Sequence, residues 1–249
     1  MLEQLKKQVC KANLQLVAEG LVIQTFGNAS GVDRASGCMV IKPSGIPYDG
    51  MKPEHMVVVS LDTGEVVEGE LNPSSDTPTH RVLYRAFGDI GGIVHTHSLY
   101  ATAWAQAGRE LPPLGTTHAD YFHGAVPVTR RMKTTEIQGD YEIHTGQVIV
   151  ERFRKMDPLA CPAVLVVSHG PFAWGSSAAD AVHNAVILEY LSRLAAQTLQ
   201  IRATTPPMMP ALLDRHFFRK HGAGAYYGQR KQSIQRNSRK NRKAGNNSY

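Results

Sequence analysis

The chain has 249 residues, of which 42% are hydrophobic and 19% are charged. This length and composition suit one large α/β domain with a substantial buried core. The apolar runs are each too short to cross a bilayer, and the N-terminus has no basic-then-apolar signal pattern. We therefore expect a cytoplasmic protein without a membrane partner.

The formal net charge is +6, but its source is local. Residues 230–249 contain seven Lys and Arg residues and no acid, which leaves a net charge of −1 on residues 1–229. The basic segment is nearly devoid of large apolar side chains, so it cannot bury enough surface to order itself. We therefore expect one domain over residues 1–229 and a basic, disordered tail over residues 230–249. Contact of this tail with nucleic acid is the less favoured interpretation.

The three cysteines, Cys10, Cys38 and Cys161, lie far apart in the sequence. Their odd number and lack of paired spacing suggest neither a disulfide framework nor a thiolate metal cage. We expect all three to be small buried apolar residues.

Residues 2–18 place apolar side chains near helical period and are followed by Gly20, which predicts an amphipathic first helix. Residues 22–31 run from a strand-like segment into a turn of glycines and small polar residues. Residues 38–45 repeat this arrangement with a clearer strand, and their turn adds a lysine and a serine. Because backbone N–H groups in such turns can face outward, the two units together suit an anion site.

Residues 56–61 and 65–68 predict a β-hairpin, since an Asp-Thr-Gly turn signal joins them. Polar cap candidates and a proline then predict that a helix starts within residues 74–80. A short apolar strand over residues 91–97 follows, and residues 98–107 are Ala-rich, as in a buried helix.

The last third of the chain alternates helix and strand patterns. Residues 145–156 predict an amphipathic helix, residues 163–172 a strongly apolar strand, and residues 180–199 a long helix packed on a sheet. Three prolines at 206, 207 and 210 rule out the continuation of that helix. Residues 216–229 form a short segment with paired tyrosines.

The strand at residues 91–97 ends in His95 and His97, separated by one residue. Because strand side chains alternate faces, both imidazoles would project to one side, about 7 Å apart. That spacing suits one metal ion, although exposed or core-edge histidines are the alternative for such a pair. His169 ends a second apolar strand and is the natural third imidazole.

Asp76 has two competing explanations. Its carboxylate could cap the helix that starts there, which would stabilise the helix by about 1 kcal/mol. It could instead supply an oxygen ligand to the metal held by His95 and His97. Ser74 and Ser75 stand beside it at a helix N-terminus, where the dipole and free N–H groups favour anions.

Residues 114–122 crowd polar and titratable groups between apolar neighbours. Asp120 in this segment is a candidate for acid-base chemistry. The alternative is that it caps or bridges a loop, and the sequence alone favours neither.

Eight motifs in one order resemble those of a known family. They are TFGN (25–28), IKPSG (41–45), SSDTPTH (74–80), GGIVHTHS (91–98), GTTHADYF (115–122), SHGPFAWG (168–175), DAVHNAV (180–186) and HGAGAYYGQ (221–229). They are similar to the L-ribulose-5-phosphate 4-epimerases, within the class II sugar-phosphate aldolase and epimerase family, and the resemblance runs from the first helix to Gln229, nearly the whole chain. The resemblance implies a single domain whose central, mainly antiparallel β-sheet is flanked by α-helices in three layers.

The resemblance also implies the roles of individual residues. The implied metal ligands, for one Zn²⁺ per subunit, are Asp76, His95, His97 and His169. The implied substrate and phosphate contacts are Gly27, Asn28, Ser44, Gly45, Ser74 and Ser75, with Thr116 and His216 in support. The implied acid-base pair is Asp120 and Tyr227, which in this family reach the metal of an adjacent subunit in a cyclic homotetramer.

The implied reaction inverts carbon 4 of L-ribulose 5-phosphate to give D-xylulose 5-phosphate, in the breakdown of arabinose or ascorbate. Carbon 4 is not adjacent to the ketone, so its proton is not acidic, and retro-aldol cleavage followed by re-addition avoids this problem. Two proton carriers then serve the two faces of the carbon. The alternative is a zinc-dependent aldolase for fuculose or rhamnulose 1-phosphate, although those enzymes use a glutamate where this chain has Asp76. A metal- or nucleic-acid-binding module is a weaker alternative from another class.

Overall fold

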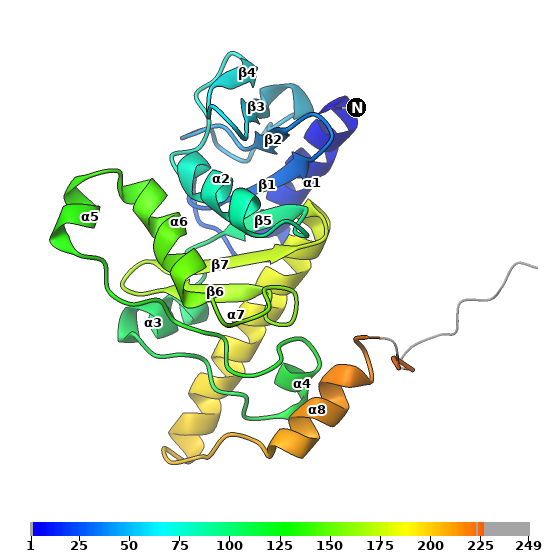
Figure 1. Cartoon of the computed structure of the whole chain (residues 1–249), viewed down its shortest axis with the longest axis vertical. Helices are drawn as coiled ribbons and strands as arrows, with labels where there is room; N and C mark the ends of the chain where they lie inside the picture. Colours follow the sequence, from blue (N-terminus) through cyan, green and yellow to red (C-terminus); the bar gives the residue numbers. More distant parts are fainter. Residues whose placement is uncertain (1, 223, 227–249) are drawn as a thin grey trace, which may run out of the picture.

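The computed structural model describes residues 2–222 and 224–226, and Figure 1 shows its elements in chain order. The strands are β1 (Asn28–Asp33), β2 (Cys38–Ile41), β3 (Val57–Ser60), β4 (Val66–Glu68), β5 (Gly92–His95), β6 (Ala163–Val166) and β7 (Gly170–Gly175). The helices are α1 (Leu2–Ala18), α2 (Thr77–Ala86), α3 (Leu99–Ala107), α4 (Thr116–Ala119), α5 (Thr134–Gln138), α6 (Tyr141–Arg152), α7 (Ala178–Ile201) and α8 (Pro210–Phe218), with a short 3-10 helix η1 (Pro53–His55).

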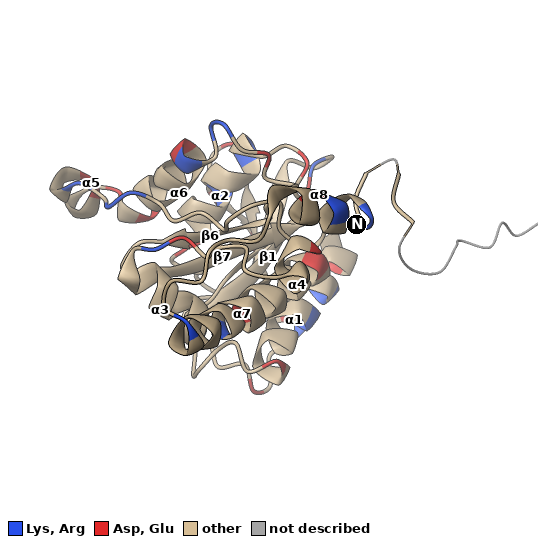
Figure 2. Ribbon diagram, turned by 90° about the horizontal axis from the view of Figure 1, so that it is seen from below, with Lys and Arg blue, Asp and Glu red and all other residues tan. Residues whose placement is uncertain are grey.

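The seven strands form one open sheet in the order β4-β3-β2-β1-β5-β7-β6. Every pair of neighbours in it is antiparallel. Figure 2 shows the sheet between two helical layers, with α2 and α6 on one face and α1, α3 and α7 on the other. The predicted three-layer α/β domain with an antiparallel sheet is therefore confirmed.

Several predicted elements are confirmed with close boundaries. The first helix covers Leu2–Ala18 and buries Val9, Ala12 and Leu16, and Gly20 follows it with a φ of 68°. The hairpin of β3 and β4 and the long helix α7 also lie where the hydrophobic pattern placed them. All three cysteines are buried, as expected.

Residues 163–172 form two strands and not one. β6 and β7 pair as a tight antiparallel hairpin, because the chain reverses at Ser168, whose φ of 60° is outside the extended region. Ser168 and His169 therefore lie in the turn, and the apolar residues after them belong to the returning strand.

Three further boundaries differ from the prediction. Residues 22–27 are not a strand, since Gln24 and Gly27 have positive φ values that turn the backbone, and β1 starts only at Asn28. Helix α6 begins four residues earlier than predicted, at Tyr141. Helix α8 was not predicted, because Pro210 was treated as a breaker although proline is compatible with the first helical turn, where it stands here.

No helix among the described residues is long and apolar enough to cross a membrane. Residue Tyr227 and the tail at 230–249 lie outside the described residues, so the predictions about them and about the domain boundary at residue 229 stay predictions.

Candidate metal centre and active site

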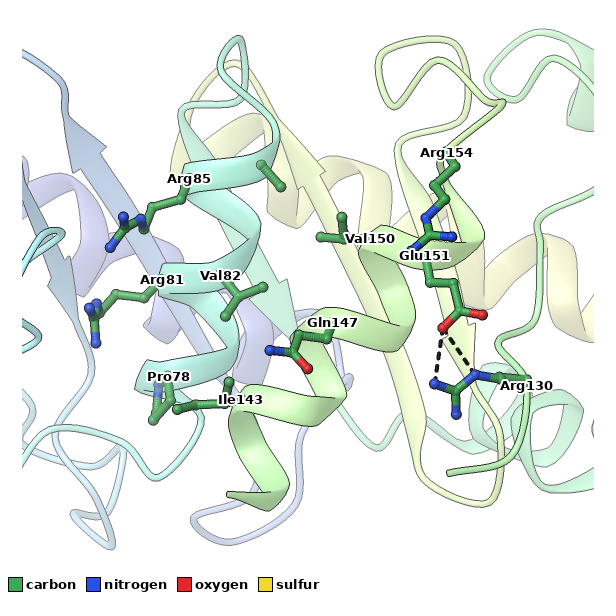
Figure 3. Close-up of a pocket in the computed structure, with 11 residues that line it drawn as sticks. Pro78, Arg81, Val82, Arg85, Arg130, Ile143, Gln147, Val150, Glu151 and Arg154 are labelled. Atoms are coloured by element: carbon green, nitrogen blue, oxygen red, sulfur yellow. Dashed lines mark hydrogen bonds and ion pairs between the residues drawn. The ribbon is translucent and has the colours of Figure 1, made fainter. Parts of the chain in front are cut away.

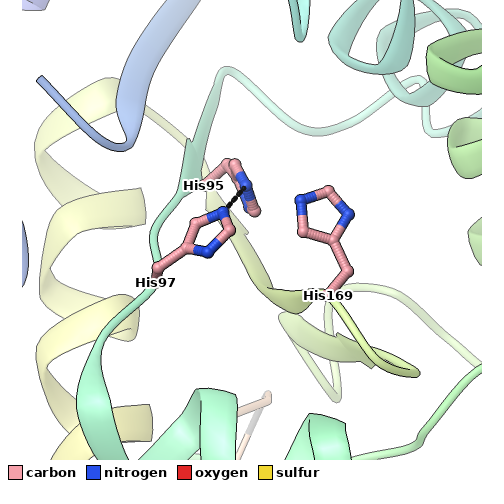
Figure 4. Close-up of side chains that lie close together, drawn as sticks. All are labelled: His95, His97 and His169. Carbon is pink, nitrogen blue, oxygen red and sulfur yellow. Dashed lines mark hydrogen bonds between the residues drawn. The ribbon is translucent and has the colours of Figure 1, made fainter.

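Three histidines converge where β5 ends and β7 begins (Figure 4). His95 is the last residue of β5, His97 follows two positions later, and His169 lies in the turn between β6 and β7. Because β5 pairs with β7 and places His95 opposite Phe172, this turn faces the end of β5. One ligand atom from each ring lies within 4.8 Å of the others, and the two Nε2 atoms of His95 and His97 are 3.1 Å apart. The predicted convergence of the three imidazoles is confirmed.

Two of these rings make a hydrogen bond through Nδ1. Nδ1 of His95 lies 2.9 Å from the carbonyl oxygen of Pro171, to which it donates, and the ring stacks on Phe172 at 4.2 Å between centroids. Nδ1 of His169 lies 3.2 Å from the hydroxyl of Tyr141. A hydrogen bond at Nδ1 leaves Nε2 for a ligand, which is the usual arrangement around metal-bound histidines.

The protonation states also suit metal binding. Burial and the neighbouring rings of His95 and His97 lower the pKa of His169 to about 4. Burial and His95 also lower the pKa of His97. At neutral pH these imidazoles are uncharged, and neutral imidazole is the form that binds a divalent cation. The chemistry of this donor set therefore fits a metal ion.

Asp76 stands at the N-cap position of α2, but its side chain makes no capping hydrogen bond. Its Oδ2 atom instead accepts a 2.6 Å hydrogen bond from Nδ2 of Asn28, and Asn28 lies opposite His95 in the pairing of β1 with β5. Burial opposes the ionisation of Asp76, but His95, His80 and Asn28 outweigh it and lower its pKa. Of the two explanations, capping is wrong. Asp76 lines the same pocket as the histidines but is not among the residues whose ligand atoms converge within 4.8 Å, so its role as a metal ligand stays a prediction.

The pocket around these residues has a volume of about 420 Å³ and includes all of the predicted phosphate contacts. Its lining contains Thr25, Phe26, Gly27, Asn28, Lys42, Pro43, Ser44, Gly45, Ser74, Ser75, Asp76, His95, His97, Tyr141, Glu142 and His169. The two segments predicted to form an anion site, residues 22–31 and 38–45, therefore meet at one place, next to the N-terminus of α2. Lys42, which also lines the pocket, is only 2% exposed and donates a hydrogen bond to the carbonyl of Pro43. Its ammonium group is therefore buried in the pocket lining.

Tyr141 and Glu142 were not predicted as site residues. They begin α6, which packs on α2, and nothing in the spacing of residues 141–156 separates them from an ordinary polar first turn. Only the contact between helices distant in sequence brings them to the pocket.

Asp120 and His216 lie in a different place from the histidine cluster. Asp120 is the C-cap residue that follows α4, and its carboxylate accepts hydrogen bonds from Arg219 at 2.8 Å and from Nδ1 of His216 at 3.1 Å. Burial opposes ionisation of Asp120, but Arg219, His216 and Lys220 lower its pKa overall. Neither Asp120 nor Thr116, the first residue of α4, lines the pocket that contains the histidines. The predicted acid-base residue and the predicted metal site are therefore separate within one chain.

A larger cavity of about 650 Å³ lies between α2 and α6 (Figure 3). Its described lining includes the arginines Arg81, Arg85, Arg130 and Arg154, and Arg130 is paired with Glu151 at 2.9 Å. No histidine or cysteine lines it within the described part of the chain, so this cavity does not compete with the histidine pocket as a metal centre.

An antiparallel sheet between helical layers, with a three-histidine pocket at the end of its strand β5, defines the class of protein. The chain belongs to the class II aldolase and adducin N-terminal domain family, whose model matches residues 7–196. Among curated relatives, the proteins named L-ribulose-5-phosphate 4-epimerase UlaF from Salmonella paratyphi B and Salmonella typhi are each 52% identical to this chain over 229 residues. These alignments cover 92% of this chain and 100% of the relatives.

Solved structures agree on the fold. An L-fuculose 1-phosphate aldolase is 25% identical, with a TM-score of 0.73 over 87% of this chain and 95% of its own. The L-fuculose-1-phosphate aldolase of Thermus thermophilus is 24% identical, with a TM-score of 0.62 over 82% of this chain and 99% of its own. The resemblance expected from the motifs is confirmed at the level of family and fold.

Proposed function

We propose that this chain is an L-ribulose-5-phosphate 4-epimerase, which inverts carbon 4 of its substrate to give D-xylulose 5-phosphate. The observation that carries the proposal is 52% identity along the full length of relatives with that name. The histidine pocket supports it, because the reaction requires charge stabilisation next to a bound phosphate. We place the enzyme in the cytoplasm, in the catabolism of arabinose or ascorbate, where such sugar phosphates are metabolised.

The proposed metal is zinc, held by His95, His97, His169 and Asp76. Imidazole nitrogens and carboxylate oxygens are ligand types that zinc binds in proteins. When bound, zinc supplies Lewis-acid stabilisation of the negative charge that develops on the oxygens of the substrate during carbon–carbon cleavage. The other contributions come from side chains of the protein.

The phosphate of the substrate is proposed to bind where the two turns meet the N-terminus of α2. Ser44 and Ser74 offer hydroxyls, Gly45 offers an unobstructed backbone, and Asn28 orients the side chain of Ser74 through a 3.1 Å hydrogen bond. Lys42 adds a buried positive charge to the pocket lining. An anion bound here is favoured by the helix dipole as well as by these donors.

The two proton carriers are proposed to be Asp120 and Tyr227, contributed by an adjacent subunit of a cyclic homotetramer. The separation of Asp120 from the histidine pocket in one chain supports this arrangement. Because Arg219 and His216 keep Asp120 ionised, it is ready to accept a proton from the hydroxyl on carbon 4. Thr116 and His216 are proposed to support the substrate and Asp120 at this interface.

Aldol cleavage of fuculose 1-phosphate is a second candidate, because the solved aldolase shares 25% identity and the fold. A coupled assay separates the two functions. We expect formation of D-xylulose 5-phosphate from L-ribulose 5-phosphate, loss of this activity with a chelator, and its return with added zinc. Release of an aldehyde from L-fuculose 1-phosphate, without any epimerisation of L-ribulose 5-phosphate, would overturn the proposal.

A further inference from the structure

Two buried polar atoms at the histidine pocket have no partner among the described residues: Oδ1 of Asn28, which lines the pocket, and Nε2 of His80 behind it. His80 on α2 is fully buried, and its Nε2 atom makes no hydrogen bond among the described residues. Buried polar atoms without a partner are rare in native proteins, so this one needs an explanation.

The His80 ring lies directly next to the site. Its backbone N–H donates to the carbonyl oxygen of Asp76 at 3.0 Å, one helical turn earlier. The ring packs edge-on against Phe172 at 6.0 Å, and Phe172 stacks on His95. Asp76 and His80 stand four positions apart at the start of α2, a spacing that brings two side chains to the same face of a helix.

A chain of hydrogen bonds determines which ring nitrogen of His80 carries the proton. Nδ1 lies 2.7 Å from Oγ of Ser30, and this Oγ lies 2.8 Å from the hydroxyl of Tyr84. Tyr84 is fully buried, and Ser30 is the hydrogen-bond partner of its hydroxyl among the described residues. The Tyr84 hydroxyl therefore donates to Ser30, because in the reverse direction its own hydrogen would be buried without an acceptor.

The remaining protons follow from that step. Ser30 accepts from Tyr84 and satisfies its own hydroxyl hydrogen only by donating it to Nδ1 of His80. A fully buried, neutral imidazole that accepts at Nδ1 carries its proton at Nε2. The unpartnered atom is therefore an N–H donor without an acceptor.

The geometry points to His80 as a positioning residue whose Nε2–H donates to the carboxylate of Asp76, directly or through one ordered water, when the site holds its metal. This inference rests on the proposed function, in which Asp76 is a metal ligand. Asn28 already holds Oδ2 of Asp76. A second donor from His80 fixes the rotation of the carboxylate, and outer contacts of this kind typically change metal affinity by about 10- to 100-fold.

Two variants separate this role from a structural one. The amide of His80→Gln reaches the position of Nε2 and can donate toward Asp76, whereas the shorter His80→Asn reaches only the position of Nδ1 and keeps the contact with Ser30. Zinc affinity of the full-length protein is measured by competition with a chelator, together with thermal unfolding. We expect about 10- to 100-fold weaker zinc binding in His80→Asn and near wild-type binding in His80→Gln.

Equal zinc affinities in the two variants, or weaker binding in His80→Gln than in His80→Asn, would overturn the inference. If either variant fails to fold, nitrogen-15 NMR of the wild-type imidazoles decides, because a proton on Nδ1 of His80 contradicts it and a proton on Nε2 supports it. A wild type that binds zinc at the three histidines but does not epimerise L-ribulose 5-phosphate defeats the proposed function alone. A wild type that binds no zinc at these histidines overturns both.

Discussion

His97 is the most direct residue-scale test of the metal centre. We expect His97→Asn to lower zinc affinity by more than about 100-fold and to abolish epimerase activity, because one of three converging imidazoles is lost. Metal analysis and the coupled assay on the same preparation measure both effects. His55→Asn, a histidine in η1 outside the pocket, is the matched control. Retention of metal by the His97 variant would remove this residue from the ligand set.

Asp120 is expected to behave differently from the metal ligands. Asp120→Asn should retain zinc and the fold but lose about 10²- to 10⁴-fold in kcat, because an amide cannot accept the proton. Asp214→Asn makes the same change on α8 at a carboxylate that is paired only with His123 among the described residues, and it should stay near wild type. Full activity of the Asp120 variant would exclude this residue from the mechanism.

His118 predicts a pH dependence of stability. Burial lowers its pKa from 6.5 to about 4 in the folded protein, so the unfolded chain takes up a proton first as the pH falls. The folded state is therefore favoured above pH 6.5, and this contribution is lost between pH 6.5 and about 4. The His118→Gln side chain can still donate to the carbonyl of Gly124. Between pH 6.5 and about 4, we expect the free energy of unfolding of this variant to fall by roughly 2–3 kcal/mol less than that of the wild type. Urea unfolding at several pH values measures it, and parallel curves would contradict the assignment.

Much of the candidate site could be predicted from single residues, and the limits have physical causes. His95, His97 and His169 stand out because each follows an apolar strand, where a polar ring is unexpected in a core. Tyr141 and His80 carry no such signal. Each lies on a helix with an ordinary pattern, and only packing against another element gives it a partner.

At the scale of elements, the close approach of β5 to α7 controls where His95 lies. A Cβ atom on Gly92 would collide with the backbone of Ser177 and Ala178, which cannot move aside as a side chain can. We expect Gly92→Ala to lower the free energy of unfolding by about 1–3 kcal/mol or more, and to weaken zinc binding as β5 shifts.

Gly88 provides the matched control for this substitution. It precedes the same strand, and a Cβ atom there meets nothing within 4 Å. Gly88→Ala should therefore change the stability by less than about 1 kcal/mol, in the stabilising direction. Equal losses from Gly92→Ala and Gly88→Ala in urea unfolding would show that the contact with α7 is unimportant.

Element types were easier to predict than element boundaries. The helical period over residues 2–18 and the turn signal between β3 and β4 are local, so both predictions are confirmed. The hairpin of β6 and β7 was missed because the apolar run over residues 163–172 was interpreted as one strand, although Ser168 and the Gly170–Pro171 pair are residue types common in turns. Helix α8 was missed because proline disrupts the interior of a helix but is favoured in the first turn, where Pro210 stands.

At the scale of the whole molecule, the proposed catalytic residues lie in two separate places. The histidine pocket lies at the end of β5, while α4 and α8 lie together at the end of the molecule far from β4 (Figure 1). Asp120 directly follows α4, and His216 lies in α8. In the proposed tetramer, each subunit would contribute its metal ligands to one active site and its Asp120 to the active site of a neighbour. An isolated chain would be inactive even when folded and loaded with metal.

Hybrid oligomers test this directly. His97→Asn and Asp120→Asn subunits are each expected to be inactive alone, but a co-expressed equal mixture should recover up to about a quarter of wild-type activity. One pairing in four places an intact metal site against an intact Asp120 from its neighbour. A mixture of His97→Asn with His169→Asn is the control, because both changes damage the metal site and no pairing restores it. Failure of the first mixture to recover activity, although its subunits assemble together, would mean that Asp120 does not act across the subunit interface.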